Sequence, residues 1–399
     1  HAHSGSGTNY GHDSTGDSMR APASLRRVVV LSLVMLFIGG IALSGCTWLG
    51  GKSKPAWVDG ATAEFSSNQY LLGQGQATNK SAATDQAYAA VARIFKAEVA
   101  AQAKDWESYL LVENRGSTNT ERRLTLDQVT NVSTDKVLEN VKILDTWYDR
   151  HQGLHYALAG MHRGQGEAAM MDKMRELDRT IETDLLEARQ TTDKLTKVRD
   201  LRRATRNLVM RDAYNADLRV IRSSGQGTPA AYRVNELSNE LDQFLSTNLV
   251  LAVEVTGDHA EPIQGSLTEG LIREGLHVTT QRAGSELLVR GTVRIWPIDV
   301  RDPQFKYVRW CSDFDVVESA TQRVVGAVSR GGKEGHLSDR EATAKALRVI
   351  QQEFSSDLAK AIASHVFGEA SLPAQAPSPA GCPRESTPAN PALSSPRPF

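Results

Sequence analysis

Cys46 is the residue whose type and position most clearly indicate chemistry. It follows a run of apolar side chains, residues 28–42, which Arg20, Arg26 and Arg27 precede. This run is shorter than the about 20 residues that a membrane span needs, and it has the length of the hydrophobic region of a secretory signal. A thiol at the end of such a segment offers a point for covalent attachment.

The sequence Leu43-Ser44-Gly45-Cys46 resembles the bacterial lipobox. The resemblance implies that signal peptidase II recognises Leu43, Ser44 and Gly45 and cleaves before Cys46. It also implies a diacylglycerol on the Cys46 thiol and a further acyl chain, such as palmitate, on the new amino group, with no other cofactor. Two or three chains anchor a protein stably, whereas one binds a membrane only marginally. The alternative interpretation is an N-terminal membrane anchor with an incidental cysteine.

The residue after the cysteine is Thr47. By resemblance to enteric lipoproteins, a residue other than Asp at this position implies anchoring in the outer membrane, on its periplasmic face. Met19 is the first methionine, and the residues before it are polar. His1, His3 and His12 among them could bind a metal as a loose cluster. We therefore expect three N-terminal segments: residues 1–18, a disordered leader that is not native; residues 19–45, a lipoprotein signal peptide; and residues 46–54, the lipidated cysteine and its tether.

Two further groups of side chains could do chemistry. His151 and His155, with His162 nearby, could hold zinc, but no cysteine or acidic ligand accompanies them at a recognised spacing. Asp313 and Asp315 could act as paired carboxylates, although alternating exposed positions of a strand explain them more simply. The sequence has no GxSxG or HExxH motif. We therefore expect no catalytic site and no bound metal, so the protein is not predicted to be an enzyme.

Two further features of the sequence each allow more than one interpretation: the cysteines other than Cys46, and the glycine pair Gly73 and Gly75. Three cysteines in the chain exclude a disulfide scaffold and a CxxC metal site. Cys311 and Cys382 could pair in the periplasm, or Cys311 could lie unpaired and buried in a strand. Gly73 and Gly75 lack the third glycine of a nucleotide-binding loop, so we interpret them as a tight turn between a strand and a helix.

The elements around these residues indicate a first α/β unit at residues 55–163. A strand is predicted at 70–78, an alanine-rich helix at 81–102, and one or two strands within 139–163, with a turn at Gly153. Together these residues resemble the Lpp-twenty family, which is named after a Helicobacter membrane lipoprotein and includes proteins linked to flagellar outer-membrane structures. The residues that carry the resemblance are Pro55, Trp57, Tyr70, Gly73, Gly75, Ala83, Ala87, Ala90, Trp147, Tyr156 and Ala159.

The middle of the chain, residues 164–247, has apolar residues at helical spacing from Met170 to Leu195, which predicts a helical segment with a coiled-coil hairpin as one interpretation. Basic residues follow, and we interpret them as a solvated helix face, with attraction of an anionic partner as the alternative. These basic residues include Lys194, Lys197, Arg202, Arg203 and Arg206.

A second α/β unit is predicted at residues 248–368 with the order β-α-β-β-β-β-α. Ser338 and Glu341 form a capping box at the start of its last helix. This unit resembles small modules of periplasmic envelope-assembly proteins, which is a likeness of fold. Residues 369–399 are rich in Pro, Ser and Ala and are predicted to form a disordered tail.

The chain has 399 residues and a formal charge of −1, which favours two or three domains and gives no sign of nucleic-acid binding. The predicted class is α+β, with helices packed on two mostly antiparallel sheets, a helical segment between them, and disordered termini.

We expect a lipoprotein that acts as a periplasmic scaffold or adaptor in envelope assembly, possible contexts including the flagellum. Expected partners are membrane lipid through Cys46, other periplasmic or outer-membrane proteins, and further copies of the chain. The alternatives are an oligomeric secretion lipoprotein and an activator of a cell-wall enzyme.

Overall fold

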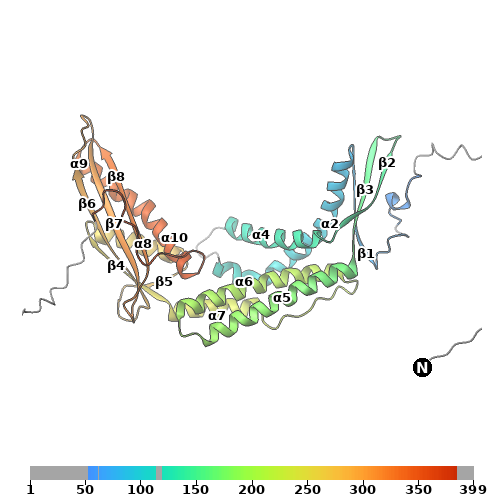
Figure 1. The fold of residues 1–399 in the computed structure, drawn as a ribbon, viewed down its shortest axis with the longest axis horizontal. Helices are drawn as coiled ribbons and strands as arrows, with labels where there is room; N and C mark the ends of the chain where they lie inside the picture. The colour runs from blue at the N-terminus through green and yellow to red at the C-terminus, as the bar shows by residue number, and fades with distance from the viewer. Residues whose placement is uncertain (1–52, 62, 114–118, 384–399) are drawn as a thin grey trace, which may run out of the picture. The chain divides into compact units, whose positions relative to one another are not determined.

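The computed structural model describes residues 53–61, 63–113 and 119–383. The described residues from 56 onward belong to one compact unit. The described part of that unit contains two β-sheets, with long helices between them in the sequence, which confirms the predicted α+β class (Figure 1). No helix in the described ranges combines the length and the hydropathy that crossing a bilayer requires.

The first sheet has three antiparallel strands in the order β1-β3-β2. A tight turn joins β2 to β3, and Gly153 in this turn has a φ of +66°, a conformation that glycine adopts without strain. The predicted turn and the strands on either side of it are therefore present. The strands are β1 Tyr70–Ala77, β2 Lys142–Asp149 and β3 Leu154–His162.

Helix α2, Lys80–Gln102, packs on one face of this sheet. Its buried side chains recur every four residues, and the first two of this stripe, Ala83 and Ala87, are small. Gly73 and Gly75 lie inside β1 and not in a turn, contrary to the prediction. A Cβ atom on Gly73 would lie 2.6 Å from the carbonyl oxygen of Ala87. The two glycines therefore let the helix backbone approach the strand closely.

Three further helical elements lie between α2 and β2, in a stretch where no element is predicted above. Trp106 at the end of the first of them is 1% exposed and joins the larger of the hydrophobic cores. These elements are a 3-10 turn at Ala103–Trp106, α3 at Glu107–Glu113 and α4 at Asn119–Leu138.

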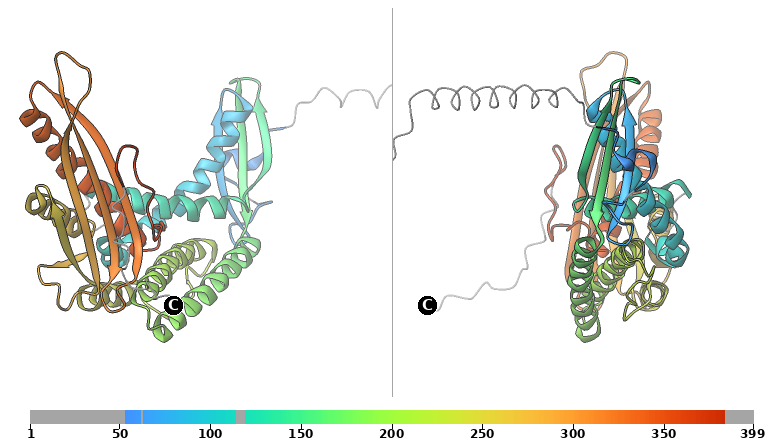
Figure 2. Two further views of the ribbon diagram at one scale, coloured as in Figure 1. Left: turned by 60° about the vertical axis from the view of Figure 1, so that its left-hand side comes forward. Right: turned by 90° about the vertical axis from the view of Figure 1, so that its right-hand side faces the viewer.

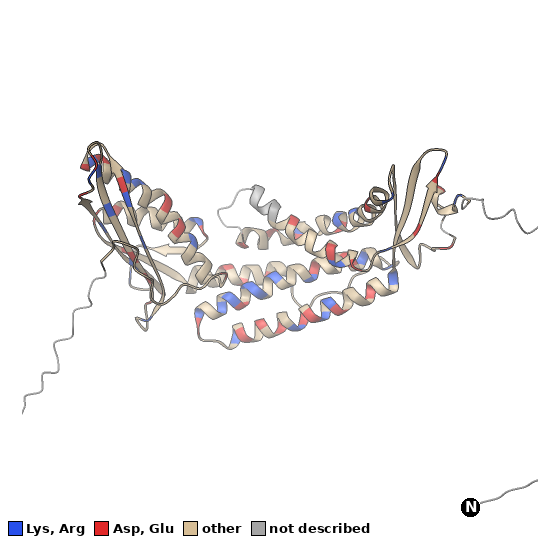
Figure 3. Cartoon of the chain, turned by 45° about the horizontal axis from the view of Figure 1, so that its top comes forward, with Lys and Arg blue, Asp and Glu red and all other residues tan. Residues whose placement is uncertain are grey.

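The predicted helical segment consists of α5, Arg163–Gln190, and α6, Lys194–Ile221, which form a hairpin, followed by α7, Val234–Asn248. Asp193 in the short connection caps α6 by accepting a hydrogen bond from the backbone N–H of Thr196. Charged residues of both signs are spread along the hairpin (Figure 3). The α5–α6 pair confirms the prediction of a helical hairpin.

The second sheet has five strands in the order β5-β4-β6-β7-β8. The pairs β6–β7 and β7–β8 are antiparallel, as expected, whereas β4 runs parallel to both β5 and β6. The parallel pairs arise because helix α8 connects β4 to β5 as a crossover. The elements are β4 Val250–Gly257, α8 Ala260–Arg273, β5 His277–Thr279, β6 Leu287–Ile298, β7 Lys306–Glu318 and β8 Val324–His336.

Helices α8, α9 (Asp339–Val349) and α10 (Ser355–Val366) share one hydrophobic core with the second sheet (Figure 2). Alternate residues of β7, Trp310 and Phe314, point into this core. A short π-helical turn, Ile350–Phe354, joins α9 to α10. The predicted capping box is present, because the Ser338 hydroxyl accepts from the Glu341 N–H and donates to the Glu341 carboxylate; these atoms complete the cap at the start of α9.

Candidate functional site

The predicted lipidation site lies outside the described residues. This applies to Cys46, to the recognition residues Leu43, Ser44 and Gly45, and to the leader and signal peptide at residues 1–45. The lipid anchor therefore remains a prediction from the sequence. The other candidate sites lie in the folded part of the chain that follows the tether.

The three histidines considered as zinc ligands do not come together. His151 lies in the β2–β3 turn, His155 stacks on Tyr148 near one end of β3 with ring centroids 4.5 Å apart, and His162 is the last residue of β3, where its ring meets the edge of Tyr70. The hairpin thus spreads these residues along its length. The arrangement offers no shared position for a zinc ion bound by all three.

Asp313 and Asp315 lie on the same face of β7, as the alternation of a strand requires. The Ser329 hydroxyl donates to Asp313 at 2.6 Å, and Arg290 forms an ion pair with Asp315 at 3.7 Å. Each carboxylate therefore interacts with a neighbouring strand, in agreement with the simpler interpretation as exposed strand residues.

Basic residues of α6 contact other parts of the chain, so the prediction of a solvated face holds only in part. The side chains of Arg203 and Arg206 are 51% and 54% exposed, whereas Arg202 is buried. The Arg202 side chain is only 10% exposed and binds Glu113 of α3 and Glu369 beyond α10. Arg206 also approaches Glu113, at 3.5 Å. Lys194 forms an ion pair with Glu286, and the Lys197 ammonium lies over the ring of Phe244. The partners are remote in sequence, so helical periodicity gives no sign of them.

A cluster of acidic residues that the sequence did not indicate lies between α5 and α6. Asp184, Glu187 and Asp200 place carboxylate oxygens within 4.8 Å of one another. Arg203 binds Asp184 at 2.8 Å and Asp200 at 2.7 Å, and burial raises the pKa of Asp200. Since the guanidinium already bridges the two buried carboxylates, we interpret the cluster as an ion-pair network that joins the helices.

Asp217 of α6 is a second buried acid, and its side chain is fully buried. It accepts a hydrogen bond from Ser133 of α4, and its second carboxylate oxygen has no hydrogen-bond partner. Burial raises the pKa of Asp217 to about 7. The packing of α4 on α6 is therefore expected to respond to pH near neutrality.

The second sheet presents its polar face away from α8, α9 and α10, and this face contains an open cleft of about 720 Å³. Side chains of both signs line it and pair with one another: Arg282 with Glu254, and Arg290 with Asp315. The strands contribute Glu254, Thr256, Arg290, Thr292, Arg294, Asp313, Asp315 and Ser329. Gln375, Ala376 and Ser378, from the segment after α10, form one side of the cleft.

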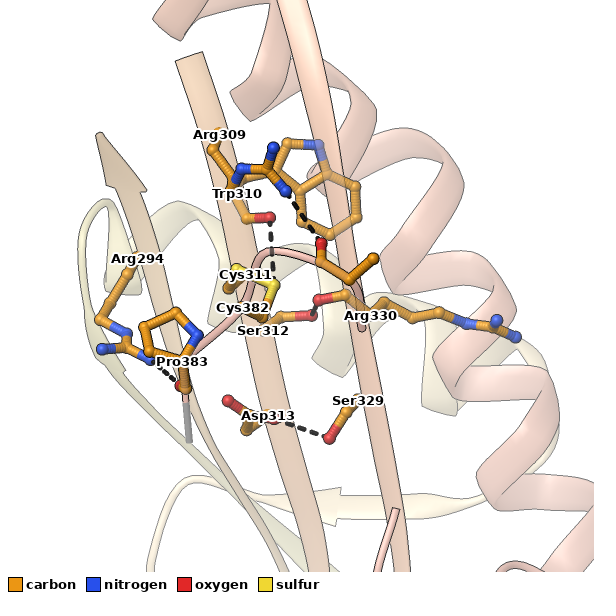
Figure 4. The surroundings of a disulfide bond; sticks show 11 residues. Arg294, Arg309, Trp310, Cys311, Ser312, Asp313, Ser329, Arg330, Cys382 and Pro383 are labelled. Carbon is orange, nitrogen blue, oxygen red and sulfur yellow. Dashed lines mark hydrogen bonds between the residues drawn. A yellow bond between two sulfur atoms is a disulfide. The ribbon is translucent and has the colours of Figure 1, made fainter. Parts of the chain in front are cut away.

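Residues 369–383, which we call the C-terminal strap, follow α10, and the end of this strap lies across the polar face (Figure 4). A disulfide joins Cys382 of the strap to Cys311 of β7. Arg309 donates to the carbonyl oxygen of Ala380 at 2.8 Å, and Arg294 donates to that of Pro383 at 3.2 Å.

The structure therefore differs from the predicted disordered tail over residues 369–383. The Pro- and Ser-rich composition gives the strap little apolar surface of its own, and its order comes from a covalent bond and from partners on the sheet. The disulfide, which the sequence left open, has one readable signal: once Cys46 is assigned to the lipid, an even pair of cysteines remains.

The first sheet also has a face opposite its helix, and the segment before β1 covers part of it. Trp57, in the 3-10 turn Ala56–Asp59, is 5% exposed, and its indole N–H donates to Asp145 of β2 at 2.8 Å. The Gln74 amide of β1 donates to the carbonyl oxygen of Trp57 at 3.0 Å. Leu158 of β3 pairs in register with both Gln74 and Asp145, so Trp57 lies over the centre of the sheet.

The match to a known family falls on this first unit. Residues 55–162 match the model of the LPP20 lipoprotein family. This LPP20 match begins just before Trp57 and ends with β3, so it includes the first sheet, α2 and the Trp57 cover. The predicted resemblance to this family is confirmed for that part of the chain, which is the folded domain directly after the lipobox-like sequence.

Similar solved structures include the secreted protein HP1454 from Helicobacter pylori, with 15% identity and a TM-score of 0.36 over 74% of this chain and 97% of that one. A minor lipoprotein from Acinetobacter baumannii has 13% identity and a TM-score of 0.22, covering 30% of this chain and 93% of its own. Lipoprotein GNA1162 from Neisseria meningitidis has 12% identity and a TM-score of 0.19 over 26% and 96% of the two chains. No curated protein matches the chain.

Proposed function

We propose that this chain is a lipid-anchored protein of the bacterial cell envelope that acts as a non-enzymatic scaffold or adaptor. The observation that carries the proposal is the order of two features along the chain. The lipobox-like sequence that ends at Cys46 stands just ahead of residues 55–162, which match a lipoprotein family. An acylated Cys46 would hold the two folded sheets at a membrane through the tether, residues 46–54.

The disulfide supports a location outside the cytoplasm. Disulfides persist in oxidising compartments such as the periplasm and are rare where thioredoxin and glutathione keep thiols reduced. Cys311 and Cys382 form such a bond in the second unit. The lipobox-like sequence and the disulfide therefore favour the same compartment through different chemistry. Thr47 after the cysteine favours the outer membrane over the inner one, as argued from enteric lipoproteins.

A role in binding other proteins is supported by the intramolecular contacts of the candidate functional side chains. The two candidate catalytic aspartates and the basic residues of α6 interact within the chain. The folded part offers two sheet faces, each crossed by a terminal segment, and long helices between them in the sequence. We infer that the chain positions these surfaces for partners, including further copies of itself, in an envelope assembly.

Metabolic labelling with palmitate and membrane fractionation of a Cys46→Ser variant test the anchor. We expect the variant to lose the label and to leave the membrane fraction, whereas the matched variant Ser44→Ala, which keeps a small residue beside the cleavage site, should keep both. Density-gradient separation of the two membranes then tests the outer-membrane assignment. A Cys46→Ser chain that still carries palmitate and still sediments with the outer membrane would overturn the proposal.

Light scattering on residues 47–399 after gel filtration tests the scaffold. A large, discrete homo-oligomer supports a ring or scaffold built from copies of this chain. A monomer supports an adaptor, whose protein partner is then captured by crosslinking in intact envelopes. Crosslinking that finds neither a second copy nor an envelope protein beside the chain would contradict both roles.

A further inference from the structure

The C-terminal strap divides into two parts that are held in different ways. Its first part, residues 369–373, is attached through several contacts: Glu369 binds Arg202, the N–H of Leu372 donates to His365 Nδ1 at 3.1 Å, and the N–H of Ala327 on β8 donates to the carbonyl oxygen of Pro373 at 2.7 Å. These contacts do not involve the disulfide. They fix the point from which the rest of the strap extends.

The second part, residues 374–383, depends on few contacts. Two arginine hydrogen bonds, from Arg309 and Arg294, hold carbonyl oxygens of this part, and both bonds are exposed. Ser378 takes part in a further interaction. The Cys311–Cys382 bond is the covalent attachment of this part to the sheet. Ordering ten residues of backbone costs far more free energy than a few such contacts return. The disulfide is therefore what keeps the second part in place.

The sheet is shaped to receive this attachment. Gly331 of β8 and Arg294 of β6 pair in register with Cys311, one on each side of it. A Cβ atom on Gly331 would lie 2.5 Å from the sulfur of Cys382, so a larger residue would occupy the space of the disulfide. Gly381, at a φ of +78°, turns the strap against the Arg309 guanidinium, where a Cβ atom would also collide.

We propose that residues 374–383 are a redox-released cover over the polar face of the second sheet, opened by thiol–disulfide exchange with an external dithiol. In the oxidised chain the cover forms one side of the cleft that contains Arg290 and Asp313. Opening it removes that side and frees the guanidinium groups of Arg294 and Arg309. The proposal goes beyond the scaffold role, because it assigns a chemical control to one of the surfaces of the protein.

The exchange has a direction that burial sets. Cys311 is 1% exposed, whereas Cys382 is only partly buried, so an incoming thiolate reaches the sulfur of Cys382. That thiolate forms a mixed disulfide with Cys382, and the sulfur of Cys311 leaves as a thiolate and takes up a proton. The second thiol of the dithiol then attacks the first sulfur of the same dithiol, which is bonded to Cys382. That bond breaks, and Cys382 leaves as a thiol. The protein disulfide has gained two electrons and two protons, and the external dithiol has become a disulfide.

The test follows cleavage within residues 374–383 by proteinase K in the full chain, purified in detergent, with dithiothreitol as the dithiol. After reduction, we expect the rate of cleavage in these residues to rise at least about tenfold, because a protease needs a mobile segment, while cleavage in residues 369–373 and in β7 stays slow. A Cys382→Ser variant should show the same fast cleavage with no reductant present. Peptide mapping after alkylation confirms that Cys311 and Cys382 are paired before treatment and free after it.

Two results would overturn the proposal. One is quantitative reduction that leaves cleavage in residues 374–383 slow, since the strap would then stay in place without its disulfide. The other is alkylation of both cysteines in the untreated chain, which would show that the bond does not form. Neither result depends on Cys46, so failure of the redox cover and failure of the lipid anchor are distinguishable.

Discussion

The two sheets of the protein have the same plan and differ in how it is completed. Each has one face packed against helices and another face crossed by a terminal segment of the chain. In the first sheet Trp57 lies over a row of three paired residues, and in the second sheet Cys382 does so. These rows are Gln74, Leu158 and Asp145 in the first sheet, and Gly331, Cys311 and Arg294 in the second.

The difference lies in the kind of bond. Trp57 is held by burial of its ring and by two hydrogen bonds to strands, so its attachment is reversible and independent of redox conditions. Cys382 has little apolar surface around it to bury and is held by a covalent bond to Cys311. A terminal segment that contains a large aromatic residue can cover a sheet by packing, whereas a Pro- and Ser-rich segment needs a covalent attachment. Variants that weaken each cover separately test this comparison.

Removing the Trp57 ring should have the largest effect. We expect Trp57→Ala to lower the free energy of unfolding by about 3–5 kcal/mol, the range for truncating a buried large aromatic side chain. The loss arises because Leu158, which is 3% exposed in the native chain, would become accessible and the Asp145 carboxylate would lose the indole donor. Urea unfolding followed by circular dichroism measures it.

Trp57→Phe is the matched control for this prediction, because it keeps a ring and loses only the donor to Asp145. We expect it to cost about 1 kcal/mol. If Trp57→Ala were as stable as the native chain, packing would not hold the first cover and the comparison between the sheets would fail.

The helical segment provides a test that is independent of both covers. The pKa of Asp217 is about 7 in the folded chain, above its ordinary value of 3.8, so folding favours the protonated acid. Stability from this group is fully present below about pH 4 and is lost as the pH rises towards 7. We expect Asp217→Asn to be neutral near pH 4 and to gain up to about 4 kcal/mol at pH 8, from roughly three pKa units.

Urea midpoints at the two pH values measure this gain, and Asp172→Asn, at an exposed acid of α5, serves as the control. An Asp217→Asn chain whose advantage is equal at both pH values would show that the acid is not titrating. Because neither cover contains Asp217, the gain should appear equally in the reduced and the oxidised chain.

Opening the disulfide should have the next largest effect on stability. The cysteines are 71 residues apart in sequence, and closing a loop of that length stabilises a fold by about 4 kcal/mol in the chain-entropy description. We expect reduction, or Cys382→Ser, to cost about 2–4 kcal/mol, since measured effects are often smaller than that limit. Urea unfolding with and without dithiothreitol checks the value, and an unchanged midpoint would contradict it.

The sequence predicts those parts of the fold that depend on near neighbours. The turn at Gly153 and the capping box of Ser338 and Glu341 involve residues a few positions apart, and both are present in the structure. The match of residues 55–162 to a lipoprotein family was likewise predicted from short motifs.

The remaining features depend on partners far apart in the chain. Arg202 reads as a surface residue of α6 until Glu113 and Glu369 are placed beside it. The strap reads as disordered because its composition does not reveal that Cys311 and Gly331 receive it. The pairing of Cys311 with Cys382 remained one of two alternatives for the same reason.

The helix-covered face of the first sheet gives the smallest expected effect and completes the comparison. Gly75 faces α2, and a Cβ atom there would collide with the backbone of Ala83 and Ala87. We expect Gly75→Ala to cost about 1–3 kcal/mol, because the helix must move away from the strand. Gly265 of α8 is the matched control, since a Cβ atom there meets nothing within 4 Å and alanine should gain up to about 1 kcal/mol. Urea unfolding of both variants separates a close contact from the general effect of replacing glycine. If Gly75→Ala gained stability as Gly265→Ala does, Gly75 would not be required for close packing of α2 on β1. A glycine required by a close contact would then be found only beside the strap of the second sheet.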